Sequence, residues 1–361
     1  MRPKTELQIH LNRLDDNYEQ LKKIAPHNEI IFMVKANGYG HGILEIVSFA
    51  YYELGIKNFG VASVGEAKLI RQMLPKILVK LYVFSDLDLL GSKELYTEYN
   101  ITPVISYIDE LKEFLESSDF KHTPLVLKFN TGMNRLGIEY DELQKVIELL
   151  KKHARLSIDH LMTHFANSYL PLKKEDKTHR QFDLFKKIKQ ELKGAGLSVL
   201  EDSVANSGAV EQQFGLECSH IRPGLMLYGA KSHPKSSWQG KCISDFKTVV
   251  LKSVLFKKGM PIGYGSQPCH EDGTVLYLPV GYGDGVFTYY SGKKINLYQR
   301  QAKILGRVNM DITSIFFEKP PRDFKRNDDF YLWGQGASEA SELAYQLKTT
   351  AYQLFTGISH R

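Results

Sequence analysis

The chain has 361 residues, of which 43% are hydrophobic and 24% charged, as in a water-soluble globular protein. This composition excludes a disordered or collagen-like chain, and no apolar run approaches the roughly 20 residues that cross a bilayer. The net charge is 47 − 41 = +6, but the lysines are scattered among acids, which argues against a nucleic-acid surface. The length suits a barrel of about 250 residues plus a smaller domain.

Two features indicate a reducing, intracellular setting. The first residues lead into no apolar signal core, so we expect a cytoplasmic protein. The three cysteines, Cys218, Cys242 and Cys269, have neither disulfide-framework nor zinc-like spacing, so we expect free thiols and no metal site.

The first two-thirds of the chain alternates β-rich runs with amphipathic segments, clearest as helices at 141–152 and 175–193. Strands are expected at 30–34, 58–62, 78–84, 101–105, 125–129, 158–163, 198–204 and 221–227. Eight such strands predict a closed α/β barrel of the (β/α)8 TIM type. A doubly wound sheet is the competing fold, but the turn after the first strand, KANGYGHG at 35–42, does not match its phosphate loop.

The pattern changes after a Ser-, Pro- and Gly-containing segment at 231–241, which is typical of a linker. Alternating strands follow at 249–256, 275–280, 302–308 and 312–317, with a helix at 338–347. We therefore expect a barrel domain over 8–235 and a mainly-β domain over 236–361 that includes an N-terminal strand at 1–7.

Polar residues just past the strand ends of such a barrel line its catalytic face. Here they include Lys35, Lys128, Arg135, His164 and Arg222, which together predict a cationic pocket for an anionic ligand. Lys35 directly follows an apolar run, and desolvation would lower its pKa and make the amine a nucleophile for Schiff-base chemistry. The alternative is a lysine whose stem packs while its head reaches water.

Two loops suit a phosphate group. Barrels often bind phosphate in the loops after the seventh and eighth strands, through backbone N–H groups. Asn206-Ser207-Gly208 follows the seventh predicted strand, and Pro223-Gly224-Leu225 lies near the start of the eighth. Tight turns between strand and helix would give the same pattern. His164 and Arg222 lie at the ends of nearby strands, and the arginine would oppose protonation of the imidazole.

Several segments, in order and over nearly the whole chain, together resemble alanine racemase, a pyridoxal-phosphate enzyme with a barrel and a β domain. The most specific are 34–42 (VKANGYGHG) and 130–137 (NTGMNRLG). Shorter matches lie at 163–166, 205–208, 222–224, 263–265, 281–285 and 306–311. One departure is Asn309, which stands where many members carry cysteine.

The resemblance implies a role for each matching residue. Lys35 would hold pyridoxal phosphate as an internal aldimine and act as the base on one face of the substrate Cα. Tyr264, supplied by the partner subunit of a homodimer, would serve the opposite face. Arg222 would face the pyridine nitrogen and hydrogen-bond His164, which in turn touches Tyr264. The implied cofactor-binding residues are Lys35, Tyr39, Asn206, Ser207, Arg222, Gly224, Leu225 and Tyr352.

The resemblance also implies the substrate site. Arg135 and the backbone N–H of Met310 would bind the carboxylate, and Lys128 matches a position that is carbamylated in some members. We expect alanine as substrate, because Tyr264, Tyr282 and Met310 should leave a narrow pocket. A broader-specificity or serine racemase is the alternative. A pyridoxal-dependent decarboxylase and a non-catalytic pyridoxal-phosphate carrier are less favoured alternatives. The alanine enantiomer that the racemase produces would supply cell-wall synthesis or a catabolic route.

Overall fold

The computed structural model describes residues 5–86 and 88–359. These residues form two compact units. The barrel unit comprises 15–227 and 235–239, and the β unit comprises 5–14, 228–234 and 240–359 of the described residues. Within the described ranges, none of the helices combines the length and the apolar character needed to span a bilayer.

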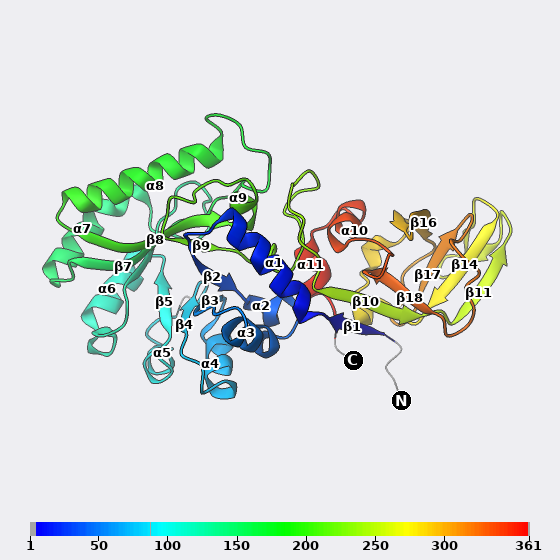
Figure 1. Ribbon diagram of the computed structural model, residues 1–361, viewed down its shortest axis with the longest axis horizontal. Helices are drawn as coiled ribbons and strands as arrows, with labels where there is room; N and C mark the ends of the chain where they lie inside the picture. The colour runs from blue at the N-terminus through cyan, green and yellow to red at the C-terminus, as the bar shows by residue number, and fades with distance from the viewer. Residues whose placement is uncertain (1–4, 87, 360–361) are drawn as a thin grey trace. The chain divides into compact units, whose positions relative to one another are not determined.

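The barrel unit contains a closed parallel barrel whose strands follow one another in sequence order, β2 to β9 (Figure 1). The strands are β2 (Glu29–Met33), β3 (Asn58–Val61), β4 (Lys80–Val83), β5 (Thr102–Ile105), β6 (Val126–Lys128), β7 (Ser157–Met162), β8 (Ser198–Asn206) and β9 (His220–Arg222). Each overlaps a strand predicted from the sequence, so the (β/α)8 prediction is confirmed. The last strand is shorter than predicted because Pro223, which has no N–H to continue a ladder, follows Arg222.

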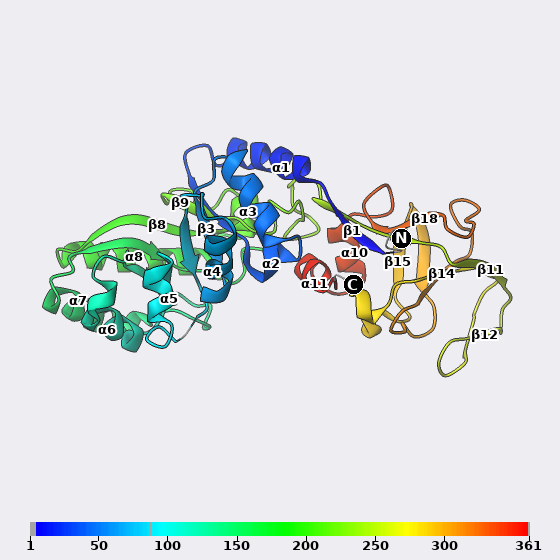
Figure 2. The same ribbon diagram turned by 90° about the horizontal axis from the view of Figure 1, so that it is seen from below.

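Helices alternate with the barrel strands along the chain. In chain order they are α1 (Leu11–Ile24), α2 (Lys35–Tyr39), α3 (Ile43–Tyr52), α4 (Val64–Met73), α5 (Lys93–Glu98), α6 (Ile108–Glu116), α7 (Leu143–Lys152), α8 (Lys177–Gly194) and α9 (Ser207–Glu211). Of these, α2 contains left-handed residues. In α7, Leu143, Val146, Ile147 and Leu150 are buried, a spacing that places them on one helical face. Figure 1 shows α8 running beside β8, and Figure 2 shows α4 beside β3; α4 also packs against β4.

The β unit is built from antiparallel strands, as the sequence predicted. One sheet has the order β1-β10-β18, a second has the order β11-β14-β17-β16-β15, and β12 pairs with β13. The strands are β1 (Glu6–Ile9), β10 (Ser244–Val249), β11 (Lys252–Phe256), β12 (Pro261–Ile262), β13 (Gln267–Pro268), β14 (Gly273–Leu278), β15 (Lys294–Leu297), β16 (Arg300–Ile304), β17 (Thr313–Phe317) and β18 (Asp329–Trp333). Residues 1–4 of the expected N-terminal strand lie outside the described residues.

Two helices complete the β unit. The predicted helix at 338–347 is present as α10 (Ala340–Gln346), and α11 (Ala351–Thr356) follows it. The apolar cluster of this unit includes Val275 and Phe316 from the five-stranded sheet and Leu305, the residue after β16.

The three cysteines are free and buried. Burial raises the pKa of Cys218 well above its usual value, and it raises that of Cys242 to about 11. Both thiols are therefore protonated and poorly nucleophilic at neutral pH.

Candidate active site

Lys35 is the first residue after the apolar run that contains β2. Phe32 and Val34 ahead of it are fully buried, so the lysine stem begins in apolar surroundings. Burial lowers the pKa of the Lys35 amine, Arg135 lowers it further, and Glu66 partly opposes both effects. This is the environment expected from the sequence, and it favours the nucleophilic, unprotonated amine.

The turn after Lys35 is left-handed. Ala36, Asn37, Gly38 and Tyr39 have φ values of 53°, 54°, 61° and 53°. For a residue that carries a side chain, this conformation costs about 1–2 kcal/mol. Strained backbone of this kind persists only where the surroundings hold it, and it gathers at functional sites.

Glu66 holds this strained turn. Its Oε1 accepts the N–H of Ala36 at 2.6 Å and its Oε2 accepts the N–H of Ala62 at 2.7 Å. Glu66 also forms a capping box with Ser63 at the start of α4. The S-x-x-E pattern at 63–66 is readable in the sequence as a helix start. Its second role is not readable, because the contact to Ala36 joins residues 30 apart.

Tyr39, Ser207 and Gly224 meet where β8 and β9 end. A Cβ on Gly224 would stand 2.6 Å from the Tyr39 hydroxyl, so the tyrosine and this stretch of backbone are in close contact. Ser207 Oγ accepts the N–H groups of Gly224 and Met226 at 3.0 and 3.3 Å. The N–H of Leu225 between them donates to no acceptor within the described part of the chain. Two hydroxyls and an unused N–H suit an anionic group.

Asn206 joins this loop to His164. Its Oδ1 accepts the N–H of Ala209 at 3.2 Å and the hydroxyl of Ser168 at 2.6 Å. Its Nδ2 lies 3.4 Å from His164 Nε2 and donates to the Phe165 carbonyl at 3.3 Å. The Asn206 side chain is thus engaged with protein groups and shapes the loop that begins α9.

Arg222 is buried at the end of β9, with 4% of its surface exposed. Its guanidinium donates to the Ser203 hydroxyl, to the Thr163 carbonyl and, at 3.3 Å, to the Val204 carbonyl. Burial lowers the pKa of Arg222 to about 10, so it remains a cation at neutral pH.

The expected hydrogen bond from Arg222 to His164 is absent from the described residues. The Nη donors of Arg222 are taken by groups on β8 and by Thr163, and His164 faces Asn206 instead. Burial and the nearby Arg222 hold the pKa of His164 well below its usual value. The imidazole is therefore neutral, which agrees with the expectation that a nearby arginine opposes its protonation.

Lys128 and Arg135 complete a cationic cluster with Lys35 and Arg222. The pKa of Lys128 is lowered to about 8, first by burial and then by Arg135, Arg222 and Lys35. Neither Lys128 nor Arg135 forms an ion pair with an acid among residues 5–86 and 88–359. Cations grouped at one site without acidic partners attract an anionic ligand.

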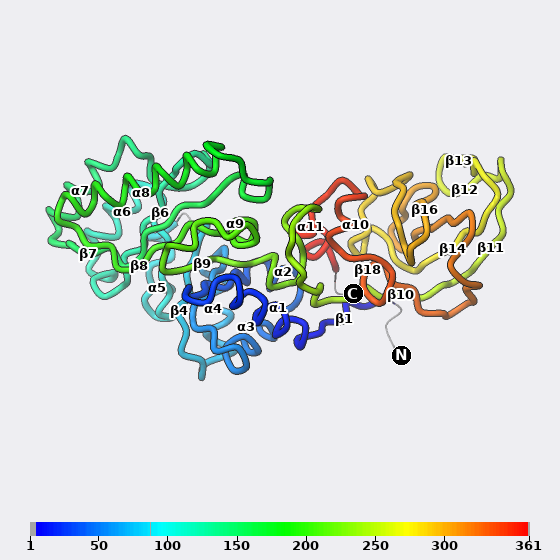
Figure 3. Tube along the Cα trace, turned by 45° about the horizontal axis from the view of Figure 1, so that its top comes forward, coloured from blue at the N-terminus to red at the C-terminus, as the bar shows by residue number. Residues whose placement is uncertain are grey.

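The other expected site residues belong to the β unit. Tyr264 lies in the loop between β12 and β13, a hairpin traced in Figure 3. Its side chain is 69% exposed, and Tyr282, Met310 and Tyr352 are also exposed. Tyr282 and Met310 lie side by side, because the N–H of Tyr282 donates to Asn309 O and that of Gly283 to Met310 O, at 2.9 and 3.0 Å. The structure thus groups the barrel residues at one site and leaves these side chains accessible in the β unit.

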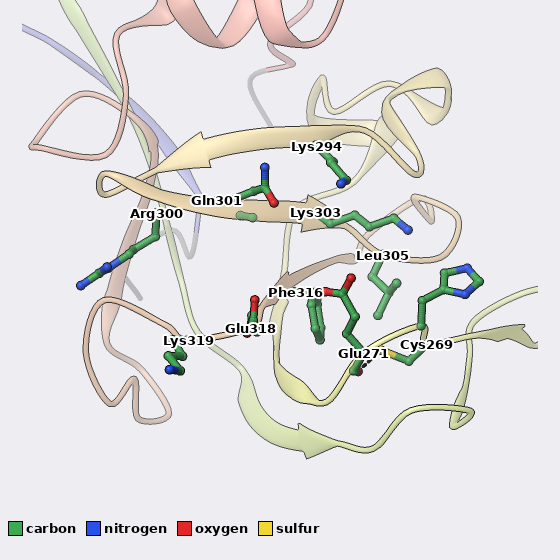
Figure 4. A pocket seen from close by; sticks show the side chains of 12 residues that line it. Cys269, Glu271, Lys294, Arg300, Gln301, Lys303, Leu305, Phe316, Glu318 and Lys319 are labelled. Carbon is green, nitrogen blue, oxygen red and sulfur yellow. Dashed lines mark hydrogen bonds between the residues drawn. The ribbon is translucent and has the colours of Figure 1, made fainter.

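A separate cavity of about 420 Å³ lies on the five-stranded sheet of the β unit (Figure 4). Its apolar lining includes Cys269, Leu305 and Phe316, and Lys294 and Lys303 are among its charged side chains. It contains none of the site residues expected from the sequence, and we assign it no role in the chemistry.

Comparison with known proteins identifies the family. Models of the alanine racemase N-terminal and C-terminal domains match residues 9–232 and 243–361. The alanine racemase of Aeromonas hydrophila is 31% identical over 98% of this chain and 97% of its own length. That of Shewanella denitrificans is 31% identical over 100% of this chain and 98% of its own.

Solved structures show the same fold. An alanine racemase from Streptomyces lavendulae has a TM-score of 0.87 at 21% identity and covers 100% of this chain and 96% of its own. One from Bartonella henselae with covalently bound pyridoxal phosphate has a TM-score of 0.85 at 24% identity and covers 99% and 98%. With both domain models matched in order over almost its entire length, the chain belongs to the alanine racemase family.

Proposed function

We propose that this chain interconverts L-alanine and D-alanine with pyridoxal phosphate bound covalently at Lys35. Membership of the family supports the reaction and the cofactor. The observation that carries the residue assignment is a lysine of lowered pKa on a strained turn, beside cations that lack acidic partners. The curated relatives are named for alanine, which does not favour the serine or broad-specificity alternative.

The barrel residues fit the cofactor at both of its ends. Tyr39, Ser207 and the backbone at Gly224 and Leu225 would hold the phosphate, with Asn206 supporting their loop. This assignment is supported by the close approach of Tyr39 to Gly224, where a side chain would displace the hydroxyl. Tyr352 of the β unit would add a further hydroxyl.

Two groups would move the Cα proton. When bound, pyridoxal phosphate supplies a conjugated system that delocalises the electron pair left on Cα. Lys35 Nζ would accept the proton of D-alanine, and its lowered pKa places the free amine closer to neutral pH. The Tyr264 hydroxyl would accept the proton of L-alanine on the opposite face, and its exposure leaves it available to a second subunit.

Arg222 would face the pyridine nitrogen of the cofactor. A buried guanidinium that stays charged discourages protonation of a neighbouring ring nitrogen. We assign His164 a role as a neutral imidazole that lies between Asn206 and the substrate. In its neutral state it can accept a hydrogen bond without adding a charge to the cationic cluster.

The substrate carboxylate would bind Arg135 and the backbone N–H of Met310, with Tyr282 closing the pocket. Lys128 lies in the same cationic cluster, and its pKa of about 8 leaves a fraction of the amine unprotonated at neutral pH. An unprotonated amine can add to carbon dioxide and release a proton, forming a carbamate. That negative charge would pair with Arg135, which lacks an acidic partner in the described part of the chain.

We further propose a homodimer in the cytoplasm, with D-alanine as the product used by the cell. The supporting observation is that Tyr264, Tyr282 and Met310 lie outside the barrel unit and are exposed. A second copy of the chain would then supply them to the barrel site, so that each site is shared.

The function is tested by trapping the cofactor. Purified protein is incubated with pyridoxal phosphate, reduced with borohydride, digested and analysed by mass spectrometry. A pyridoxyl adduct on Lys35, together with production of D-alanine from L-alanine, is the expected result. An adduct on another lysine, or racemisation that survives Lys35→Ala, would contradict the assignment. Lys57→Ala, an exposed lysine near β3, is the matched control.

A further inference from the structure

A line of polar side chains leads from Arg222 into the barrel, and the proposed function does not use it. The Arg222 guanidinium donates to Ser203 Oγ. Ser203 Oγ lies 2.7 Å from His160 Nε2, and His160 Nδ1 lies 3.4 Å from Glu201 Oε2. We call Ser203, His160 and Glu201 the support chain of Arg222.

The strand register brings these residues together. Between β7 and β8, His160 pairs with Glu201 and Met162 with Ser203. Between β8 and β9, Asn206 pairs with Arg222. Ser203 and His160 are 0% and 1% exposed, so water does not replace their hydrogen bonds.

The donors and acceptors of the support chain fix the direction of its hydrogen bonds. Arginine can only donate, so Ser203 Oγ must accept from it, and the serine hydrogen is then free to donate to His160 Nε2. A neutral His160 that accepts at Nε2 carries its proton at Nδ1, which faces the Glu201 carboxylate. All three donors then point from Arg222 towards Glu201, and each bond polarises the next.

The far end of the support chain is a fixed negative charge. Lys80 Nζ lies 3.2 Å from Glu201 Oε1, leaving Oε2 to His160. The hydrogen bond from His160, together with the nearby Lys80 amine, lowers the pKa of Glu201 to about 2, so the carboxylate is ionised. Arg222 has no ion pair of its own with an acid in the described part of the chain, and Glu201 is the acid that its hydrogen bonds reach.

A second histidine in this cluster does not share that role. The hydroxyl of Ser219 donates to Asp202 O, so towards His220 Nδ1, at 2.9 Å, it must accept. Neutral His220 therefore has its proton on Nδ1, and its Nε2, 3.7 Å from Glu201 Oε2, has none to donate. His220 packs against His160 with ring centres 5.1 Å apart but has no hydrogen bond to Ser203.

We propose that Ser203 and His160 are positioning residues that fix the orientation of the Arg222 guanidinium by linking it to Glu201. The link itself needs only the apoprotein. Its consequence for catalysis rests on the proposed function, in which Arg222 faces the cofactor ring.

The test compares three variants. His160→Phe keeps an aromatic ring but removes both nitrogens, His160→Gln retains an acceptor and a donor, and His220→Gln changes the neighbouring ring only. Side-chain NMR of arginine-labelled apoprotein, with Arg222 assigned by Arg222→Lys, reports guanidinium rotation. We expect separate, slowly exchanging Nη signals in the wild type, His160→Gln and His220→Gln, and merged signals in His160→Phe.

Kinetics of the holoenzyme give the second readout. Losing the orientation of a charged hydrogen-bond donor should lower kcat for racemisation about tenfold in His160→Phe. KM should stay within about twofold, because Arg222 does not bind the substrate carboxylate in this scheme. His160→Gln should recover most of the loss, and Ser203→Ala should reproduce it.

Three results would overturn the proposal. One is an unchanged Arg222 spectrum in His160→Phe. Another is an equal effect of His160→Phe and His220→Gln, which would indicate packing alone. The ligand atoms of His160, Glu201 and His220 lie within 4.8 Å of one another, so spectra are also recorded with Zn²⁺ and with a chelator. A metal on His160 Nδ1 in the protein as purified would exclude the donor that the chain requires. If the apoprotein spectra agree but no pyridoxal phosphate binds, the proposed function fails and the link stands.

Discussion

The hydroxyl of Tyr39 approaches Gly224 so closely that a Cβ at position 224 would stand 2.6 Å from it. Gly224→Ala should therefore displace the Tyr39 hydroxyl and weaken pyridoxal-phosphate binding by about tenfold, the loss of one charge-assisted hydrogen bond. Fluorescence titration of the apoprotein measures this. Gly194→Ala is the control, because its added methyl meets nothing within 4 Å. Equal affinity of Gly224→Ala and the wild type would contradict the phosphate assignment.

Mixed dimers test the sharing of sites. Lys35→Ala and Tyr264→Phe should each have little activity alone. Once their subunits exchange, a heterodimer has one site with both native residues, and about a quarter of wild-type activity should return at equal mixing. Activity of the mixture is measured against time after mixing. Recovery that never exceeds the sum of the separate variants would show that each chain uses its own Tyr264.

Tyr264→Phe should separate the two faces of the substrate. Exchange of the Cα proton of L-alanine for deuterium should slow by at least about 100-fold, since the general base is lost. Exchange from D-alanine, which uses Lys35, should fall much less. Proton NMR of each enantiomer in deuterated buffer follows the two rates. Tyr345→Phe, another exposed tyrosine of the β unit, should leave both rates unchanged.

Glu66→Gln should loosen the left-handed turn after Lys35. The amide of glutamine has one oxygen and cannot accept both N–H groups that Glu66 holds. Glu66 also raises the pKa of Lys35, so its loss should move that pKa further down. The pH profile of imine formation with pyridoxal phosphate, followed by absorbance, should shift to lower pH. Glu116→Gln, an exposed change on α6, should leave the profile in place.

The lowered pKa of Lys128 predicts that the stability of the folded protein rises with pH. Its folded-state pKa of about 8 is below the ordinary 10.5, so the unfolded chain binds more protons between these values. Below pH 8 the buried, charged Lys128 amine lowers the free energy of unfolding by its full amount. As pH rises towards 10.5 this loss is recovered, and the free energy of unfolding increases by about 3 kcal/mol in all. Urea unfolding in carbonate-free buffer measures this. Lys35 and the two buried thiols, whose raised pKa values act in the opposite direction, are present in both the wild type and Lys128→Met, so the difference between the two curves isolates Lys128. The difference should change as pH rises from 8 to 10.5, and a constant difference would contradict the assigned burial.

The strand ends were the most informative part of the sequence. In a parallel barrel all carboxyl ends meet at one face, so Lys35 and Lys128 could be grouped from the pattern alone. Arg222 stood at the start of the predicted strand 221–227, and it is the shorter β9 that places it at a carboxyl end. The support chain could not be predicted in this way, because Ser203 and His160 sit within strands. Their pairing depends on the register of β7 and β8.

The β unit shows a second reason for misses. The pattern gave no strand over β10, because Asp245 and Lys247 interrupt its apolar residues. Asp245 is fully buried there and pairs with Arg13 at 2.6 Å and His10 at 3.0 Å. Those partners lie more than 200 positions away in the chain, so no local pattern could show that the charge is satisfied.

The reactivity of the buried thiols reports how often the protein opens locally. Cys218 lies in the barrel unit, and Cys242 and Cys269 lie in the β unit. An alkylating reagent can reach each sulfur only when the surrounding layer separates. Labelling all three cysteines with a thiol reagent, and measuring the labelling rate of each by mass spectrometry, therefore compares how often the barrel unit and the β unit open locally. No added probe is needed.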